Sequence, residues 1–271
     1  MKKFGLIGNP IAHSMSPALF KTAYDGAYEY DLIEGEFEEV YQRFLDHYDA
    51  INVTAPFKEM ACSKADVLSP ECEMIGACNV LQKTQEGILA VNTDYLAVMK
   101  ALIQHQVVGL SPLVVVVGCG GAGKAAACAA CELGHEVVIL NRNQIKADKF
   151  VEKLRSLGKN YQVKSRPLSE FRKWFAKAGT IIYALPSPID ALAELRKCDI
   201  RGGIFRTFPK VVLEANYKDP SFTPEIISQF CTVNPKLSYV SGREWLLDQA
   251  VEAYGLFTGE QPNIQKMIKV L

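Results

Sequence analysis

The chain has 271 residues and no formal net charge at pH 7, which allows two domains that each bury a core. The neutral balance argues against nucleic acid as the main partner, and no apolar stretch is long enough to span a membrane. Gly8, Asn9 and Pro10 interrupt any apolar core that would follow the charged start as a signal peptide.

The cysteines and histidines indicate no metal or disulfide framework. The eight cysteines lack regular spacing, which predicts reduced thiols in a cytoplasmic protein. Cys128 and Cys131 form a C-x-x-C pair inside an alanine-rich helix without a second pair, so small core-facing residues are the favoured interpretation. The four histidines are scattered, and no metal site is predicted.

Strands and helices are expected to alternate up to position 105. Strands are predicted at 3–7, 28–34 and 50–53, and helices start at Ser16-Pro17, near Val40 and at Pro56-Phe57-Lys58. Residues 79–82 and 88–91 are expected to form a hairpin around Glu86-Gly87. A helix from Asp94 to about His105 then leads through Gly109 to Pro112 into the second half.

The second half predicts one further sheet. Its strands are expected at 114–117, 136–140, 162–164, 180–184 and 211–215, with terminal helices at 242–257 and 262–270. Alternation of strands and helices on both sides of position 105 predicts the α/β class, with two domains and a cleft between them.

Polar residues gather at the ends of the first predicted strands, where open α/β sheets bind ligands. Ser14 and Ser16 lie at a helix start, where hydroxyls, free amides and the helix dipole suit the carboxylate of a small acid. On spacing alone, a turn residue at position 14 and a helix cap at position 16 explain them better.

Lys58 and Asp94 are candidates for proton transfer. Lys58 lies just inside a helix N-terminus, where the dipole disfavours a cation, so a use beyond helix stability is indicated. A surface lysine is the ordinary alternative. Asp94, in Asn92-Thr93-Asp94, either caps the next helix or pairs with Lys58, and the residues alone leave this open.

The segment from Val114 to Lys124 contains G-x-G-x-x-G between a valine strand and a helix of small residues. Gly118 suits the tight turn, Gly120 the approach of backbone amides to a pyrophosphate, and Gly123 the packing of helix on strand. With Gly121 and Ala122 between them, these residues predict a dinucleotide site at a helix N-terminus.

The end of the next strand indicates which dinucleotide binds. It reads Asn141-Arg142-Asn143, where sites for NAD usually carry an acidic residue for the ribose hydroxyl. A guanidinium can grip a 2′-phosphate with paired hydrogen bonds, so NADP is favoured over NAD. For Arg142 this interpretation outweighs a solvated helix start; for Lys146 the two are balanced.

Taken together, these segments resemble the shikimate dehydrogenase family over nearly the whole chain. Besides the glycine loop and Asn141-Arg142, the resemblance rests on residues 5–17, 52–58, 75–79, 92–94 and 242–250, in the family's order and at matching separations. It implies a substrate domain of residues 1–101 and 241–271, and a Rossmann-like NADP-binding domain of residues 102–240.

The resemblance also implies a reaction and its residues. The reaction is reversible reduction of 3-dehydroshikimate to shikimate by NADPH, a step of chorismate and aromatic amino acid synthesis. Ser14 and Ser16 would hold the substrate carboxylate, and Lys58 and Asp94 the reacting hydroxyl, with Lys58 as the acid–base group. The further substrate contacts implied by the family are Thr54, Asn79, Gln249 and Tyr217, of which Tyr217 has a strand-end tyrosine as its plain alternative.

The sequence departs from the family pattern on the cofactor side. Tyr95-Leu96-Ala97 replaces Gly-x-Gly after the Asn-Thr-Asp motif, and residues 182–188 lack the polar loop that lines the cofactor in the family. Ala90, Glu214 and Trp245 replace the glycine, aspartate and methionine that are usual there. The departures predict altered cofactor contacts around an intact substrate site.

Three functions are therefore weighed. The first is an NADP-dependent shikimate dehydrogenase, as a monomer or homodimer with a small-molecule substrate. The second is a relative that uses quinate or NAD. The third is a weakly catalytic sensor of a small acid or nucleotide. Only the departures at Tyr95, Tyr183 and Leu185 support it. The retained Lys58 and Asp94 argue against it.

Overall fold

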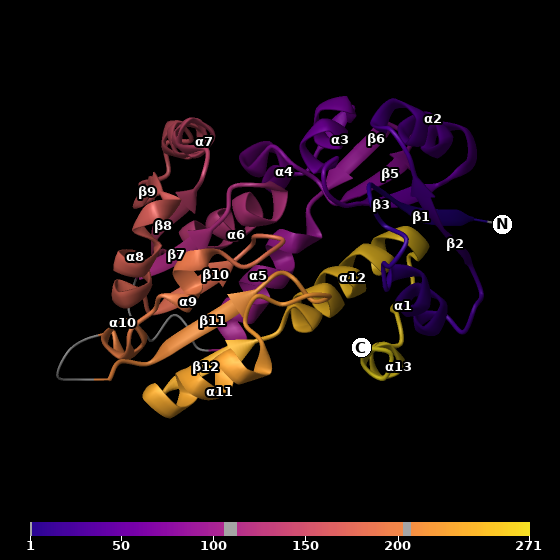
Figure 1. Ribbon diagram of the computed structural model, residues 1–271. Helices are drawn as coiled ribbons and strands as arrows, with labels where there is room; N and C mark the ends of the chain where they lie inside the picture. The colour runs from indigo at the N-terminus through magenta and orange to yellow at the C-terminus, as the bar shows by residue number, and fades with distance from the viewer. Residues whose placement is uncertain (1, 106–112, 203–206) are drawn as a thin grey trace. The chain divides into compact units, whose positions relative to one another are not determined.

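The computed structural model describes residues 2–105, 113–202 and 207–271. The chain forms two compact units, unit 1 (Met1–Leu96 with Leu247–Leu271) and unit 2 (Ala97–Leu246). The divisions fall within helices α5 (Thr93–Gln104) and α12 (Gly242–Thr258). Each unit contains its own six-stranded sheet, with the elements labelled in Figure 1. The predicted connection through Gly109 to Pro112 lies outside the described residues.

Unit 1 has a mixed sheet in the order β2-β1-β3-β5-β6-β4. Its strands are β1 (Lys3–Gly8), β2 (Glu29–Glu34), β3 (Ala50–Val53), β4 (Val67–Leu68), β5 (Val80–Thr84) and β6 (Gly87–Val91). The predicted strands and the hairpin are confirmed. The prediction lacks β4, because two residues are too few to show an alternating pattern.

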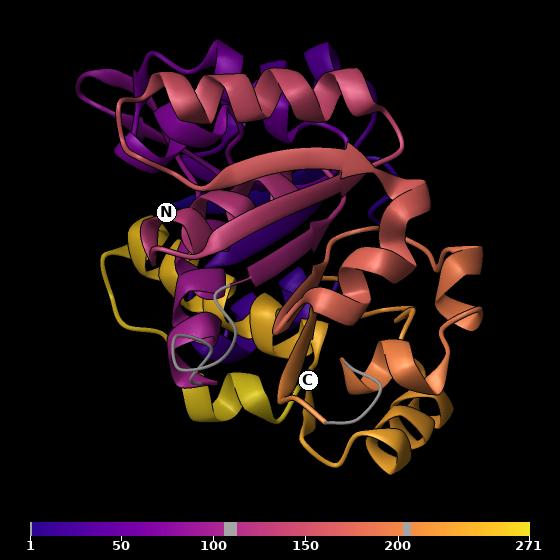
Figure 2. The same cartoon turned by 90° about the vertical axis from the view of Figure 1, so that its left-hand side faces the viewer.

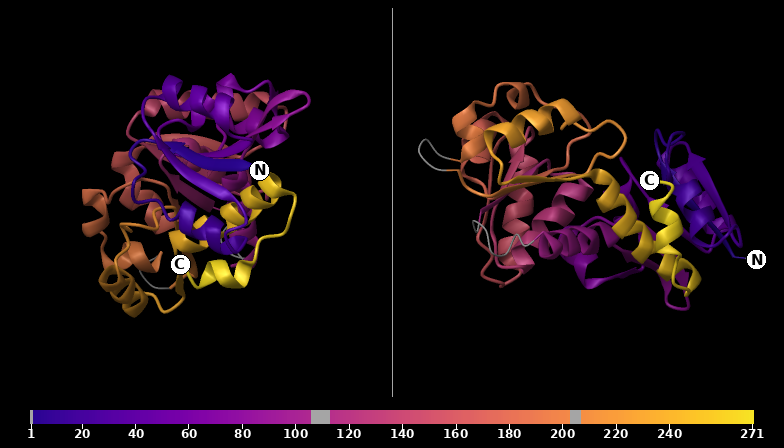
Figure 3. Two further views of the ribbon diagram at one scale, coloured as in Figure 1. Left: turned by 90° about the vertical axis from the view of Figure 1, so that its right-hand side faces the viewer. Right: turned by 90° about the horizontal axis from the view of Figure 1, so that it is seen from below.

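Helices pack around this sheet. They are α1 (Ser16–Ala23), α2 (Phe37–His47), α3 (Lys58–Lys64), α4 (Pro70–Ile75), the end of α12 and α13 (Ile264–Ile268). Buried residues of α2 and α3 join the sheet in one core, while α1 packs against α13, as Figure 3 shows. Ser16 is the first residue of α1 rather than its cap, and Met15 occupies the N-cap position.

Unit 2 has an all-parallel sheet in the order β12-β11-β10-β7-β8-β9. Its strands are β7 (Leu113–Val117), β8 (Glu136–Asn141), β9 (Val163–Pro167), β10 (Thr180–Tyr183), β11 (Lys210–Glu214) and β12 (Leu237–Val240). All residues of β7 are buried, which explains its run of valines, since a parallel strand is covered on both faces. When β7 is counted as strand 1 and the sheet is read from β9 to β12, the strand order is 3-2-1-4-5-6, which is that of doubly wound folds.

Besides parts of α5 and α12, the described residues of unit 2 form the helices α6 (Gly121–Glu132), α7 (Gln144–Ser156), α8 (Phe171–Lys177), α9 (Asp190–Ala193), α10 (Lys197–Arg201) and α11 (Pro224–Val233). Figure 2 shows α7 lying along β8 and β9, against which it packs. On α6, Cys128 and Cys131 are free and buried, and burial raises the pKa of Cys131 to about 12. Their interpretation as core-facing residues is confirmed. Over the described residues, no helix is long and apolar enough to cross a membrane.

Lys210, the first residue of β11, is a buried cation in unit 2. Its side chain is 1 % exposed, and Nζ donates to the carbonyl oxygens of Phe175 at 2.7 Å and Ala178 at 2.5 Å. These carbonyls belong to the end of α8, so Lys210 satisfies acceptors that the helix leaves unpaired. Burial lowers the pKa of Lys210 to about 8.

We expect this lysine to make the stability of unit 2 rise at alkaline pH. Between pH 8 and the unfolded-state pKa of about 10.4, the folded chain has released a proton that the unfolded chain still binds. The free energy of unfolding of the wild type should therefore gain about 3 kcal/mol, relative to Lys210→Met, between pH 7 and pH 10.5. Denaturant titrations of both proteins at the two pH values measure this, and parallel pH profiles would contradict it.

Candidate functional site

Strand register brings four segments of unit 1 to one edge of its sheet. β1 and β3 are parallel, so their C-terminal ends, at Gly8 and Val53, lie at the same edge. β5 runs antiparallel to β3, which places its first residue, Val80, opposite Asn52. β6 in turn is antiparallel to β5 and ends with Val91 opposite Val80. The polar segments that follow or precede these ends therefore converge.

Lys58 and Asp94 meet at this edge. Lys58 is the first residue of α3, which follows β3, and Asp94 is in the first turn of α5, which follows β6. The Lys58 Nζ to Asp94 Oδ2 distance is 2.5 Å, and the side chains are 15 % and 7 % exposed. The pairing that the sequence left open is present. Limited solvent access weakens screening of the two charges, so the carboxylate holds the ammonium in one orientation.

Asn92, rather than Asp94, caps α5. Its Oδ1 accepts from the backbone N–H of Tyr95 at 3.1 Å, and its Nδ2 donates to the carbonyl of Ala77 at 2.8 Å. Because Asn92 satisfies the helix terminus, the carboxylate of Asp94 is available for the lysine. Sequence reasoning treated Asn92 as part of the motif without a role of its own.

Asn79, Thr93 and Gln249 form one hydrogen-bonded network. Asn79 is 2 % exposed, and its Oδ1 accepts from the Thr93 N–H at 2.7 Å. Its Nδ2 donates to Thr93 Oγ1 at 2.8 Å and to Gln249 Oε1 at 3.0 Å. The Thr93 hydroxyl then donates to the Gln249 carbonyl at 2.9 Å. The network ties α12 to the sheet edge, and Thr93 is a member that the motif search missed.

Ser14, in the loop between β1 and α1, lies next to Ser16, the first residue of α1. Their Oγ atoms are 3.1 Å apart, and Ser14 Oγ accepts from the Ser16 N–H at 3.2 Å. Glu34, at the end of β2, holds the same loop because its Oε2 accepts from the N–H groups of Ile11 at 2.7 Å and Ala12 at 3.0 Å. Glu34 carried no motif signal, since only the neighbouring strand places it there.

The remaining predicted substrate residues lie in different units. Thr54 follows β3, and its N–H donates to the carbonyl of Ile7 at 2.9 Å, which places it at the same edge as Lys58. Tyr217 lies in unit 2, half-buried in a turn after β11. Asn216 shapes that turn by accepting from the N–H groups of Lys218 and Asp219. Tyr217 is therefore outside the cluster that unit 1 assembles by itself.

The glycine loop of unit 2 has two glycines that no other residue could replace without a shift. Gly118 has a φ of 108°, in the left-handed region. A Cβ at Gly123 would lie 2.2 Å from the Gly118 carbonyl oxygen, so α6 packs directly on the turn. The roles predicted for these two glycines in turn and packing are confirmed. Gly121 and Ala122 form the first turn of α6, whose free N–H groups favour an anion.

Arg142 follows β8 and is exposed at the same edge as the glycine loop, because β7 and β8 are parallel neighbours. Within the described residues, its guanidinium has no hydrogen-bond or ion-pair partner. Asn143 caps α7 by accepting from the Lys146 N–H at 3.0 Å, while Asn141 Nδ2 donates to the Asn143 carbonyl at 2.8 Å. The turn is thus held by the asparagines, which leaves Arg142 available for a ligand.

Two of the departures from the family pattern have structural explanations. Tyr183 is fully buried, stacks edge-on against Phe222 and donates to the Ser187 carbonyl at 2.9 Å. Its ring therefore belongs to the core of unit 2. Glu214 is also buried and accepts from the Ser221 N–H at 2.6 Å and the Tyr239 hydroxyl at 2.8 Å. Burial raises the pKa of Glu214.

A doubly wound parallel sheet with a glycine loop after its first strand defines unit 2 as a Rossmann-type α/β fold. Residues 6–81 match the family profile described as the shikimate dehydrogenase substrate binding domain. A relative from Archaeoglobus fulgidus named shikimate dehydrogenase (NADP(+)) is 31% identical over 98% of this chain and 96% of its own length. One of the same name from Haemophilus ducreyi is 29% identical over 100% of this chain and 96% of its own length.

A solved structure of the same family also matches the chain. Shikimate 5-dehydrogenase from Thermus thermophilus, in complex with NADP(H) and shikimate, matches with a TM-score of 0.77 and 25% identity. The match covers 100% of this chain and 98% of that one. The chain belongs to the shikimate dehydrogenase family.

Proposed function

We propose that this protein is an NADP-dependent shikimate dehydrogenase that reversibly reduces 3-dehydroshikimate to shikimate. The observation that carries the proposal is the pair of Lys58 and Asp94, 2.5 Å apart at a polar sheet edge. Family membership supplies the reaction, and relatives with this name act on shikimate with NADP(+). We assign the step to chorismate and aromatic amino acid synthesis, as family membership implies.

Residues of unit 1 would bind and orient the substrate. Ser14 and Ser16 would hold the carboxylate with their hydroxyls, and Thr54, Asn79 and Gln249 would contact the carboxylate side or the ring hydroxyls. The hydrogen bonds of Asn79 with Thr93 orient the Asn79 amide, so that its donor and acceptor ends are fixed before the substrate arrives. We assign Tyr217 of unit 2 to the same substrate.

Lys58 and Asp94 would carry the proton chemistry. In the reductive direction Lys58 donates a proton to the carbonyl oxygen as it becomes a hydroxyl, and in the oxidative direction it accepts that proton. Asp94 holds the Lys58 ammonium in position through their hydrogen bond. The ring carbon gains one hydride and the oxygen one proton, which balances the reduction.

Residues of unit 2 fit NADP. The first turn of α6 offers N–H groups to a pyrophosphate, and a Cβ at Gly120 would meet nothing within 4 Å, so the backbone there is open to a ligand. We assign Arg142 to the 2′-phosphate, with Asn141 and Lys146 beside it. When bound, the reduced cofactor supplies the hydride.

The test is absorbance at the reduced-nicotinamide band. Purified protein receives shikimate or quinate with NADP⁺ or NAD⁺, in all four pairings. We expect reduction with shikimate and NADP⁺. Reduction only with quinate or with NAD⁺ would move the assignment to a relative of different specificity. No reduction by folded protein that still binds shikimate would identify a small-acid sensor.

Two alanine substitutions in the glycine loop should separate folding from cofactor binding. At Gly123 the new Cβ meets backbone, so we expect Gly123→Ala to destabilise unit 2 by about 1–3 kcal/mol. At Gly120 the space is open, so Gly120→Ala should change stability by under about 1 kcal/mol yet weaken NADP⁺ binding on the order of tenfold. Thermal unfolding and calorimetric titration measure the two effects. Equal NADP⁺ affinity in Gly120→Ala would show that the pyrophosphate lies elsewhere.

A further inference from the structure

Unit 2 contains a polar cavity at the edge of its sheet opposite the glycine loop. It has a volume of about 410 Å³ and lies where β8 and β9 begin and α7 ends. The glycine loop and Arg142 follow the C-terminal ends of β7 and β8, so the cavity and the proposed cofactor residues lie at opposite ends of the same strands. The volume is within the range of small-molecule sites.

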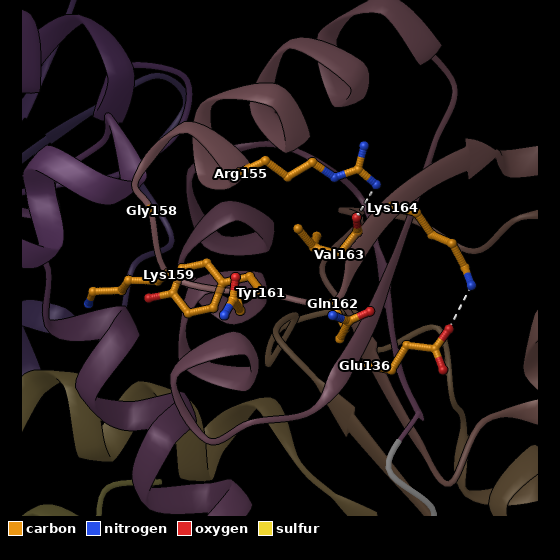
Figure 4. Close-up of a pocket in the computed structure, with 9 residues that line it drawn as sticks. Glu136, Arg155, Gly158, Lys159, Tyr161, Gln162, Val163 and Lys164 are labelled. Carbon is orange, nitrogen blue, oxygen red and sulfur yellow. Dashed lines mark hydrogen bonds and ion pairs between the residues drawn. The ribbon is translucent and has the colours of Figure 1, made fainter.

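Three cations line this cavity against a single carboxylate. Figure 4 shows Arg155, Lys164 and Glu136 around one side and Lys159 with Tyr161 on the other. Lys164 Nζ lies 2.6 Å from Glu136 Oε1, so this pair is already neutralised. Lys159 is paired as well, with Glu132 of α6, so the excess positive charge of the lining comes from the Arg155 guanidinium.

Arg155 and Lys159 differ in how many N–H donors their present contacts leave unused. Arg155 Nη2 donates to the carbonyl of Val163 at 2.7 Å, a contact that orients the guanidinium while leaving most of its N–H groups for another acceptor. Lys159 Nζ lies 2.5 Å from Glu132 Oε1 on α6. Its ammonium has further protons to donate, and the hydrogen bond with Glu132 raises the pKa of Lys159, so it stays charged.

We infer that this cavity binds a small organic anion through an oxyanion group, either phosphate or carboxylate. A guanidinium fixed by a backbone contact presents a planar fork that matches both groups, and Lys159 adds a point charge. Gln162 in the lining supplies an amide for hydroxyls of the ligand, beside the Tyr161 ring. The cavity shares no residue with the proposed catalytic pair, so the inference stands whether or not the protein reduces 3-dehydroshikimate.

The test is calorimetric titration of the full chain with inorganic phosphate and with citrate. Arg142→Ala serves as the background, so that the proposed 2′-phosphate position contributes least. We expect saturable binding of at least one probe, and the one that binds identifies phosphate or carboxylate as the group recognised. Lys159→Gln, which removes no backbone contact, should weaken binding about tenfold, and adding Arg155→Gln should weaken it further.

Lys153→Gln is the matched control, because Lys153 is an exposed lysine of α7, the helix that carries Arg155, and does not line the cavity. It should leave the affinity unchanged. Equal losses in Lys153→Gln and Lys159→Gln would mean that overall charge attracts the anion, and this would overturn the inference. Binding that survives both cavity substitutions would show that the anion binds elsewhere. Absence of saturable binding would show that the cavity is not an anion site. Either result would also overturn the inference.

Discussion

Lys58→Ala should lower turnover by about 10²–10⁴-fold, the range that general acid–base catalysis contributes. The variant keeps Ser14, Ser16 and the network of Asn79, which are the residues assigned to hold the substrate. We therefore expect shikimate affinity to change far less than turnover. Steady-state kinetics with shikimate and NADP⁺, combined with calorimetric binding of shikimate, measure the two quantities separately.

Two controls distinguish chemistry from folding. Lys58→Ala leaves Asp94, which is 5 % exposed, without its ion pair, and an unpaired buried charge destabilises a fold. The double variant Lys58→Ala/Asp94→Asn removes that charge and should recover stability without recovering turnover. Lys64→Ala removes an exposed lysine from the other end of α3 and should leave turnover intact. Wild-type turnover in Lys58→Ala would refute the proton-transfer role.

Arg142→Ala should raise the Michaelis constant for NADPH on the order of 10- to 100-fold while changing that for NADH little. The reason is that only NADPH carries the 2′-phosphate, and hydrogen bonds between two charged groups are each worth about 1.5–3 kcal/mol. Because the asparagines on either side hold the turn by themselves, the substitution should not disturb β8 or α7.

The comparison of the two cofactors is the internal control for this prediction. A general loss of folding or of pyrophosphate contacts would raise both Michaelis constants together. Such an equal effect would mean that Arg142 does not contact the 2′-phosphate. Lys146→Ala, measured in the same way, tests whether the second cation contributes, since the sequence left its role evenly balanced.

Local pattern was sufficient for most strands and for the glycine loop. The valine run of β7 predicts a buried strand, and the glycines at 118 and 123 predict the turn that follows it. Both features depend on residues that are close together in the sequence. Short elements such as β4 and α4 were not predicted. Two or six residues show too little periodicity, and packing against the sheet stabilises them.

The site was predicted as separate polar sets, and register joined them. Whether Asp94 caps a helix or pairs with Lys58 depends on a distance across 36 positions of chain, which no spacing rule reports. Glu34 and Thr93 were missed for the same reason, because their hydrogen bonds arise only once β2, β6 and α12 lie at one edge. Conversely, Tyr183, a departure by sequence, belongs to the core.

The sequence by itself determined the α/β class, the family and the residue types of the candidate site, because these depend on local period and on motifs in order. Only the tertiary structure decided which polar groups meet. Hydrogen bonds and ion pairs require approach within about 3 Å, and strand register sets that approach between residues far apart in the chain. The cavity around Arg155 is the clearest case, since none of its residues belongs to a motif.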